Sequence, residues 1–142
     1  MIVKLLFLLN VCYLVFAPWQ NQKADEDWKM IEGAWIPVVA ELGGKPLPQE
    51  FLKDTKLVLA DGHYTYINDH GTYKLIPGET PKAMDITGKE GPNQGKTLLA
   101  IYELTGDTLR ICYDLEGKTR PSEFATKAGT QQLLVSYKRA KP

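Results

Sequence analysis

The chain has 142 residues and a mass of 15.9 kDa, and 44% of its residues are hydrophobic, which suits one globular domain and excludes a wholly disordered chain. Lys and Arg total 17, as do Asp and Glu, so the formal net charge is +0. The strong basic excess of a nucleic-acid-binding surface is absent, and we expect no nucleic-acid partner.

Residues 1–24 have the pattern of a secretory signal peptide. The apolar run Leu5–Phe16 is shorter than the ~20 residues that a membrane-spanning helix needs, and Pro18 follows it. We expect cleavage after Ala24, with an uncleaved membrane anchor as the alternative. The mature domain would then span residues 25–142, have no stable transmembrane span, and be secreted or held in the periplasm or cell envelope.

Only one of the two cysteines, Cys112, lies in the expected mature domain, which therefore has no internal disulfide. The mature domain also lacks an Asn-x-Ser/Thr site, and export without either feature is more typical of bacteria. Because neither histidine is near Cys112 in the predicted strand pairing, we interpret its thiol as a small buried hydrophobe.

Short β-type runs separated by Gly and Pro turn signals predict an all-β domain with an antiparallel up-and-down barrel. Trp28–Glu32 is expected to form a short helical lead-in and Pro48–Lys53 a helical turn, while Pro37 marks an edge or bulge. About eight strands are expected, the usual number for a small barrel. The predicted strands are Ala34–Leu42, Lys56–Ala60, His63–Asn68, Thr72–Ile76, Ala83–Thr87, Thr97–Leu104, Thr108–Asp114 and Gln132–Arg139.

Tight turns predict how these strands pair. Asp61-Gly62 closes a hairpin that puts Tyr64 and Tyr66 on the inner face. His70-Gly71 is expected to close the next hairpin, with Tyr66 opposite Leu75.

A further turn at Gly106-Asp107 pairs Glu103 with Arg110 as a cross-strand salt pair on the outer face. The predicted inner face comprises Leu57, Leu59, Tyr64, Tyr66, Leu75, Leu98, Tyr102, Leu104, Leu109, Ile111 and Tyr113, with Leu133, Val135 and Tyr137 from the last strand.

Gly33-Ala34-Trp35 opens the first predicted strand, and Lys138-Arg139 ends the last one. This resembles the lipocalin and calycin arrangement, in which a Gly-x-Trp tryptophan packs at the closed end of a barrel beneath a basic residue from the last strand. The resemblance implies that Arg139 stacks on Trp35 in a cation–π contact that closes the barrel.

Four segments together extend the resemblance over nearly all of the mature chain. Trp35–Pro48, Met84–Ile86, Ile101–Cys112 and Arg120–Phe124 resemble an uncharacterised secreted domain family abundant in planctomycete bacteria. The resemblance implies a lipocalin-like barrel outside the cytoplasm. It implies no established activity and no catalytic residues.

A tyrosine-rich inner face favours a binding cavity, because each buried hydroxyl needs a hydrogen-bond partner. We expect a small apolar or aromatic ligand, bound by Tyr64, Tyr66, Tyr102 and Tyr113 with Trp35 at the floor. The alternative is a barrel filled by its own side chains, acting as a structural or interaction module of the cell envelope.

A third hypothesis is an enzyme, with Asp85, Arg120 and Cys112 as candidate residues. Asp85 is expected instead to bond Arg120 or a tyrosine hydroxyl. No catalytic arrangement of residues is found in the sequence.

The sequence motifs that could indicate a bound cofactor or metal ion are weak. Gly91–Thr97 lacks the P-loop spacing and precedes a predicted strand, so we interpret it as a flexible hairpin loop. His63, His70 and the nearby Asp69 are interpreted as surface turn residues, because a metal site needs three or four converging ligands. We expect neither a cofactor nor a metal.

Overall fold

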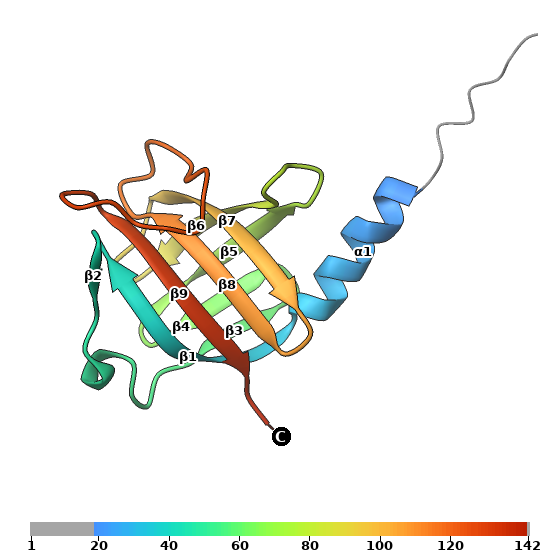
Figure 1. Cartoon of the computed structure of the whole chain (residues 1–142). Coiled ribbons are helices and arrows are strands. Elements are labelled where there is room, and N and C mark those ends of the chain that lie inside the picture. Colours follow the sequence, from blue (N-terminus) through green and yellow to red (C-terminus); the bar gives the residue numbers. More distant parts are fainter. Residues whose placement is uncertain (1–18, 142) are drawn as a thin grey trace, which may run out of the picture.

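The computed structural model describes residues 19–141, so residues 1–18 of the expected signal peptide lie outside the described part. The described chain forms an antiparallel β-barrel with a helix at one end (Figure 1). Its elements are α1 (Trp19–Ile31), β1 (Gly33–Leu42), β2 (Lys45–Pro46), the 3₁₀ turn η1 (Gln49–Phe51), β3 (Leu57–Ala60), β4 (His63–Tyr66), β5 (Asp69–Ile76), β6 (Ala83–Glu90), β7 (Thr97–Thr105), β8 (Thr108–Asp114) and β9 (Gln132–Arg139).

The sheet closes on itself because β1 pairs with β3 on one side and with β9 on the other. The other strands pair with their sequence neighbours from β3 to β9, and the short β2 adds to the end of β1. Closure gives each of the eight main strands a hydrogen-bonded neighbour on both sides. The predicted eight-stranded up-and-down barrel is confirmed, with β2 as one extra strand.

A bulge in β1 interrupts its pairing with β9 between Pro37 and Val39. Proline has no N–H for the ladder, so a bulge is a position where it is tolerated. The predicted irregularity at Pro37 is confirmed. The helical turn expected over Pro48–Lys53 is also present, as η1.

Two hairpins have the predicted register. In β3–β4, Leu59 pairs with Tyr64, and in β7–β8, Glu103 pairs with Arg110. The Arg110 guanidinium donates to the Glu103 carboxylate at 3.1 Å on the outer face.

The turn between β4 and β5 was predicted wrongly. It lies at Ile67-Asn68 instead of His70-Gly71, and Tyr66 pairs with Asp69 instead of facing Leu75. Ile67 has φ 55, a left-handed conformation that β-branched residues rarely adopt, so local sequence preference argued against a turn here.

This turn changes which residues of β5 face inward. Asp69, Gly71, Tyr73 and Leu75 alternate as the buried residues of the strand. Asp69, which was expected at the surface, is therefore buried.

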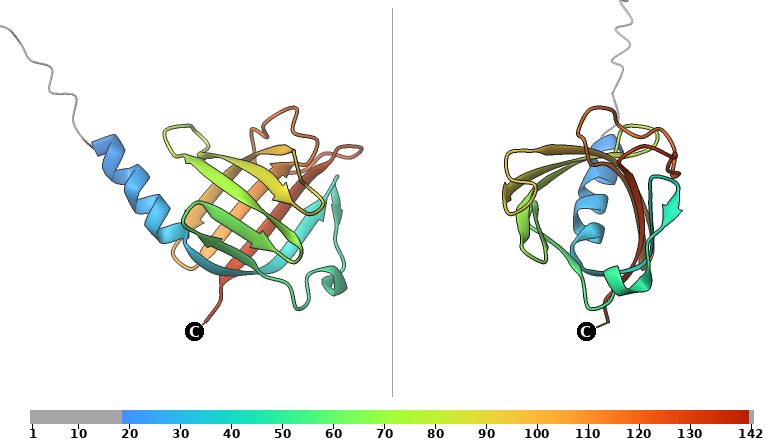
Figure 2. Two further views of the ribbon diagram at one scale, coloured as in Figure 1. Left: turned by 180° about the vertical axis from the view of Figure 1, so that it is seen from behind. Right: turned by 90° about the vertical axis from the view of Figure 1, so that its left-hand side faces the viewer.

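Helix α1 is longer than the predicted lead-in, since it begins at Trp19 instead of Trp28. It meets the barrel through its last turns and projects away from it (Figure 2). Trp28 stacks on Tyr73 with ring centroids 5.2 Å apart. Within residues 19–141, no helix combines the length and apolar character needed to cross a membrane.

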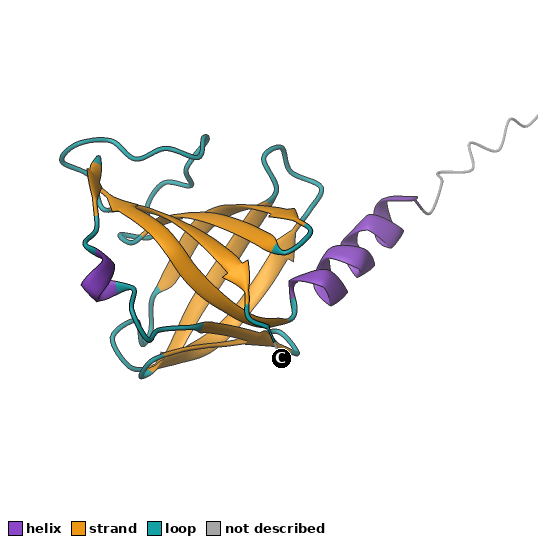
Figure 3. Cartoon of the chain, turned by 60° about the horizontal axis from the view of Figure 1, so that its bottom comes forward, coloured by secondary structure: helices purple, strands orange, loops and turns teal. Residues whose placement is uncertain are grey.

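Trp35 and Arg139 close the barrel at the α1 end. The Trp35 ring is fully buried, and its Nε1 donates to the carbonyl of Ile31 at 2.8 Å. The Arg139 guanidinium lies 4.3 Å from the Trp35 ring centroid and donates to the carbonyls of Met30 and Glu32. This is the stacked pair that the lipocalin-like resemblance implies. Figure 3 shows η1 at the opposite end, which we call the open end.

Candidate functional site

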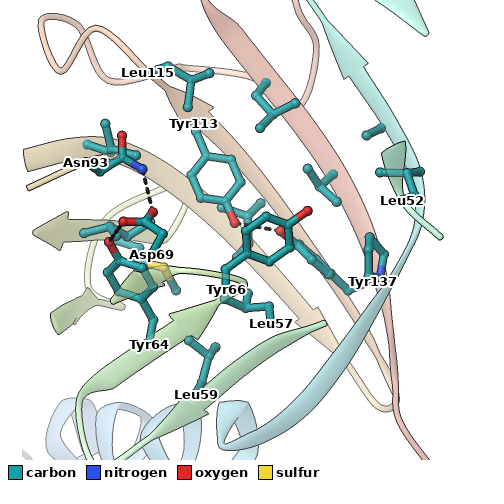
Figure 4. Close-up of a pocket in the computed structure, with 18 of the residues that line it drawn as sticks. Leu52, Leu57, Leu59, Tyr64, Tyr66, Asp69, Asn93, Tyr113, Leu115 and Tyr137 are labelled. Carbon is teal, nitrogen blue, oxygen red and sulfur yellow. Dashed lines mark hydrogen bonds between the residues drawn. The ribbon is translucent and has the colours of Figure 1, made fainter. Parts of the chain in front are cut away.

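A cavity of about 360 Å³ lies inside the barrel (Figure 4). Its lining begins at Leu59, which pairs with Gly33 beside α1, and reaches Phe51 of η1 and Leu115 of the β8–β9 loop at the open end. Most of the lining is apolar: Pro37, Ala40, Leu47, Phe51, Leu52, Leu57, Leu59, Met84, Ile86, Leu98, Ile111, Leu115, Leu133 and Val135. Six polar or amphipathic residues complete it: Tyr64, Tyr66, Asp69, Asn93, Tyr113 and Tyr137.

Asp69 is the centre of one polar group on the cavity wall. The Tyr64 hydroxyl donates to its Oδ1 at 3.2 Å, and Asn93 Nδ2 donates to its Oδ2 at 2.6 Å. Asp69 is only 9% exposed. Burial and then the neighbouring Asp69 charge raise the pKa of Tyr64 to about 12, so the Tyr64 hydroxyl stays protonated as a donor at neutral pH.

Asn93 reaches this group because the β6–β7 loop folds back on its own strand. Gly95 N donates to the carbonyl of Gly88 at 3.0 Å, and Gly88 N donates to the carbonyl of Lys96 at 2.9 Å. A Cβ at Gly88 would lie 1.9 Å from the Asn93 carbonyl oxygen, so this close approach requires glycine. Residues 91–96 thus form a loop with a defined, hydrogen-bonded conformation, and Thr97 begins β7.

Tyr113 and Tyr137 form a second polar group, with their hydroxyl oxygens 2.9 Å apart. Burial raises the pKa of both hydroxyls, so both remain neutral. Tyr66 is half-buried beside them, and its hydroxyl bonds no other described residue. The Tyr66 hydroxyl is therefore available to a molecule in the cavity.

The predicted ligand-binding residues are only partly brought together. Tyr64, Tyr66 and Tyr113 line the cavity, whereas Trp35 and Tyr102 do not. Trp35 is covered by Arg139 at the α1 end, and the Tyr102 hydroxyl donates to Asp27 of α1. The polar atoms of both side chains therefore hydrogen-bond to α1.

Asp69 and Asn93 were missed as site residues, and Tyr137 was assigned only to the inner face. The period-two alternation of β5 signals Asp69 once the turn is placed at Ile67-Asn68. No periodicity signals Asn93, because it lies in a loop.

The other candidate residues lie outside the cavity lining. Arg120 donates to the Asp85 carboxylate at 2.6 Å, which confirms the structural pairing expected for Asp85. Cys112 is fully buried and its Sγ lies 3.6 Å from the carbonyl of Ala125. Burial raises the pKa of the Cys112 thiol, which favours its protonated form.

The two histidines do not build a metal centre. His63 is exposed and its Nδ1 contacts the carbonyl of Asp61 at 2.9 Å. The Nδ1 atom of His70 lies 3.4 Å from the Thr65 hydroxyl. Across the described range 19–141, no three His, Cys, Asp or Glu side chains cluster as metal ligands.

Comparisons with known protein families, with curated proteins and with solved structures found no match. What the cavity can bind is therefore inferred from the residues that line it.

Proposed function

We propose that this protein is an exported, lipocalin-like barrel that binds a small apolar or aromatic ligand in its interior. The observation that carries the proposal is the cavity of about 360 Å³ inside the barrel. Its size falls within the range of small-molecule sites, and so does its composition of apolar walls with a few placed polar groups.

The cavity also argues against the filled-barrel alternative. An eight-stranded barrel is narrow enough for side chains to fill it completely, and here they leave a ligand-sized space. The candidate residues of the enzyme hypothesis, Asp85, Arg120 and Cys112, lie outside the lining of this space.

Export is supported by the sequence of residues 1–24, with its apolar run and following proline. We place the protein in the secreted or cell-envelope fraction, and fractionation of the producing cells with an antibody to the barrel tests this placement.

Binding is tested by thermal unfolding of the full chain with a panel of small apolar and aromatic compounds. We expect one class of compound to raise the melting temperature and to change tyrosine and tryptophan fluorescence. The proposal is contradicted if no compound in the panel raises the melting temperature or changes the fluorescence.

A matched pair of variants tests whether the ligand binds inside the barrel. Ala40→Phe places a ring in the cavity and should abolish binding, whereas Val38→Phe adds the same ring on an exposed position of the same strand and should preserve it. Equal loss of binding in both variants would place the site elsewhere.

A further inference from the structure

Three carboxylates are buried among the described residues, and their environments differ. Asp27 lies 2.8 Å from the Lys82 ammonium. Asp114 accepts the backbone N–H groups of Glu116, Lys118 and Thr119. Both acids thus have a compensating cation or a set of backbone dipoles.

Asp69 has neither form of compensation. Its two hydrogen-bond donors, Tyr64 and Asn93, are neutral side chains. None of the ion pairs in residues 19–141 includes Asp69. A buried carboxylate without a countercharge is costly, and proteins normally pair such groups.

The Asp69 carboxylate faces the cavity, so a positive charge on a molecule in the cavity could compensate it. Asp69 lines the cavity beside the ring of Tyr64 (Figure 4). A carboxylate has about four acceptor positions, and the two donors occupy two of them. The remaining positions can accept N–H groups from a molecule in the cavity.

We propose that the ligand of this cavity is a hydrophobic amine, whose positively charged nitrogen pairs with Asp69 and whose apolar body packs against the aliphatic walls. This inference rests on the proposed function and names its ligand class. The tyrosine rings along the cavity add cation–π attraction for the same charge. The free Tyr66 hydroxyl provides a second acceptor.

The same geometry disfavours acidic ligands. A ligand carboxylate near Asp69 would face a like charge in a low-dielectric space, where repulsion is strong. A neutral alcohol of the same shape keeps the apolar contacts but leaves Asp69 without a countercharge. The three headgroups therefore rank as amine, alcohol and acid in decreasing affinity.

The test uses matched sets of primary amine, alcohol and carboxylate, each built on phenylethyl, indolylethyl and octyl bodies. Affinities for the full chain are measured by isothermal titration calorimetry. We expect at least one amine to bind about tenfold or more tightly than its alcohol, with the acid weakest. Asp69→Asn should remove this preference, so that amine and alcohol bind about equally. Asp61→Asn, the same charge change in an exposed turn, should keep it.

The outcomes separate the two proposals. Equal binding of amine and alcohol, or preferential binding of the acid, overturns the amine assignment and leaves ligand binding intact. Binding of no compound in any set contradicts both. If Asp69→Asn does not fold, as judged by circular dichroism, the ranking of headgroups on the unmodified protein still decides the assignment.

Discussion

The Tyr102 hydroxyl donates a 2.6 Å hydrogen bond to the carboxylate of Asp27, 75 positions away in the chain. The Lys82 ammonium binds the same Asp27 oxygen at 2.8 Å. Strand β7 and the loop before β6 are thereby tied to α1. This small charged network fastens the helix to the barrel. It includes the hydroxyl of Tyr102, which the sequence assigned to the ligand site.

Tyr102→Phe should weaken the attachment of α1 to the barrel without changing ligand binding. Loss of a hydrogen bond to a charged acceptor is expected to lower the free energy of unfolding by about 1.5–3 kcal/mol. Ligand affinity should not change, because Tyr102 does not line the cavity. Urea denaturation measures the first effect and calorimetric titration the second. A large loss of affinity with unchanged stability would return Tyr102 to the binding site.

Arg139→Ala should destabilise the closed end. The substitution removes the stack on Trp35 and leaves the carbonyls of Met30 and Glu32 without their donor. We expect a cost of about 1–3 kcal/mol and a change in tryptophan fluorescence as Trp35 gains solvent. Lys138→Ala, at the exposed neighbouring position, is the control and should cost less than about 0.5 kcal/mol. Equal effects of the two variants would contradict a specific role for Arg139.

Ile67→Asn should stabilise the protein. Ile67 has φ 55 and is 65% exposed, so it carries backbone strain and contributes little burial. Asparagine tolerates the left-handed region, and relief of the strain is expected to raise the free energy of unfolding by about 1 kcal/mol. Chemical denaturation provides the measurement. Substitution of Thr65, an exposed strand position of the same hairpin, by Asn should not stabilise; a gain there as large as at Ile67 would exclude strain relief as the cause.

Alkaline pH should destabilise the barrel through Tyr64. Its pKa is raised by burial from 10.0 to about 12 in the folded protein, so the folded state holds the proton more tightly than the unfolded state. The resulting stabilisation is complete below pH 10 and is lost as pH rises toward 12. The slope contributed by Tyr64 in that interval is at most about 1.4 kcal/mol per pH unit. Denaturation curves of the parent and of Tyr64→Phe test this, since the variant should lack the Tyr64 contribution; identical slopes would show that Tyr64 ionises normally.

The sequence predicted the strand pairing correctly where favourable turn residues and the alternation of apolar and polar residues indicated the same register. Asp61-Gly62 and Gly106-Asp107 are favourable hairpin turns, and the alternating strands beside them left one register that keeps Glu103 and Arg110 outside. The β4–β5 hairpin failed because Ile67 adopts a backbone conformation that its side chain disfavours, and tertiary pairing overrides that preference.

The candidate site was only half predictable for the same reason. Tyr64, Tyr66 and Tyr113 follow from strand alternation, whereas Asp69 depends on the misplaced turn. Asn93 reaches the cavity through a loop whose path depends on the close packing at Gly88, which no pattern in the sequence expresses.

Native mass spectrometry of the protein, in the form purified from the cells that naturally produce it, tests ligand binding most directly. The account predicts a stoichiometric small molecule that is retained in the native spectrum and released on denaturation, and that carries a basic nitrogen. The same preparation of Ala40→Phe should lack it. A ligand-free mass for the parent protein, together with no binding of added amines, would contradict the central claim and indicate that the barrel acts through its outer surface.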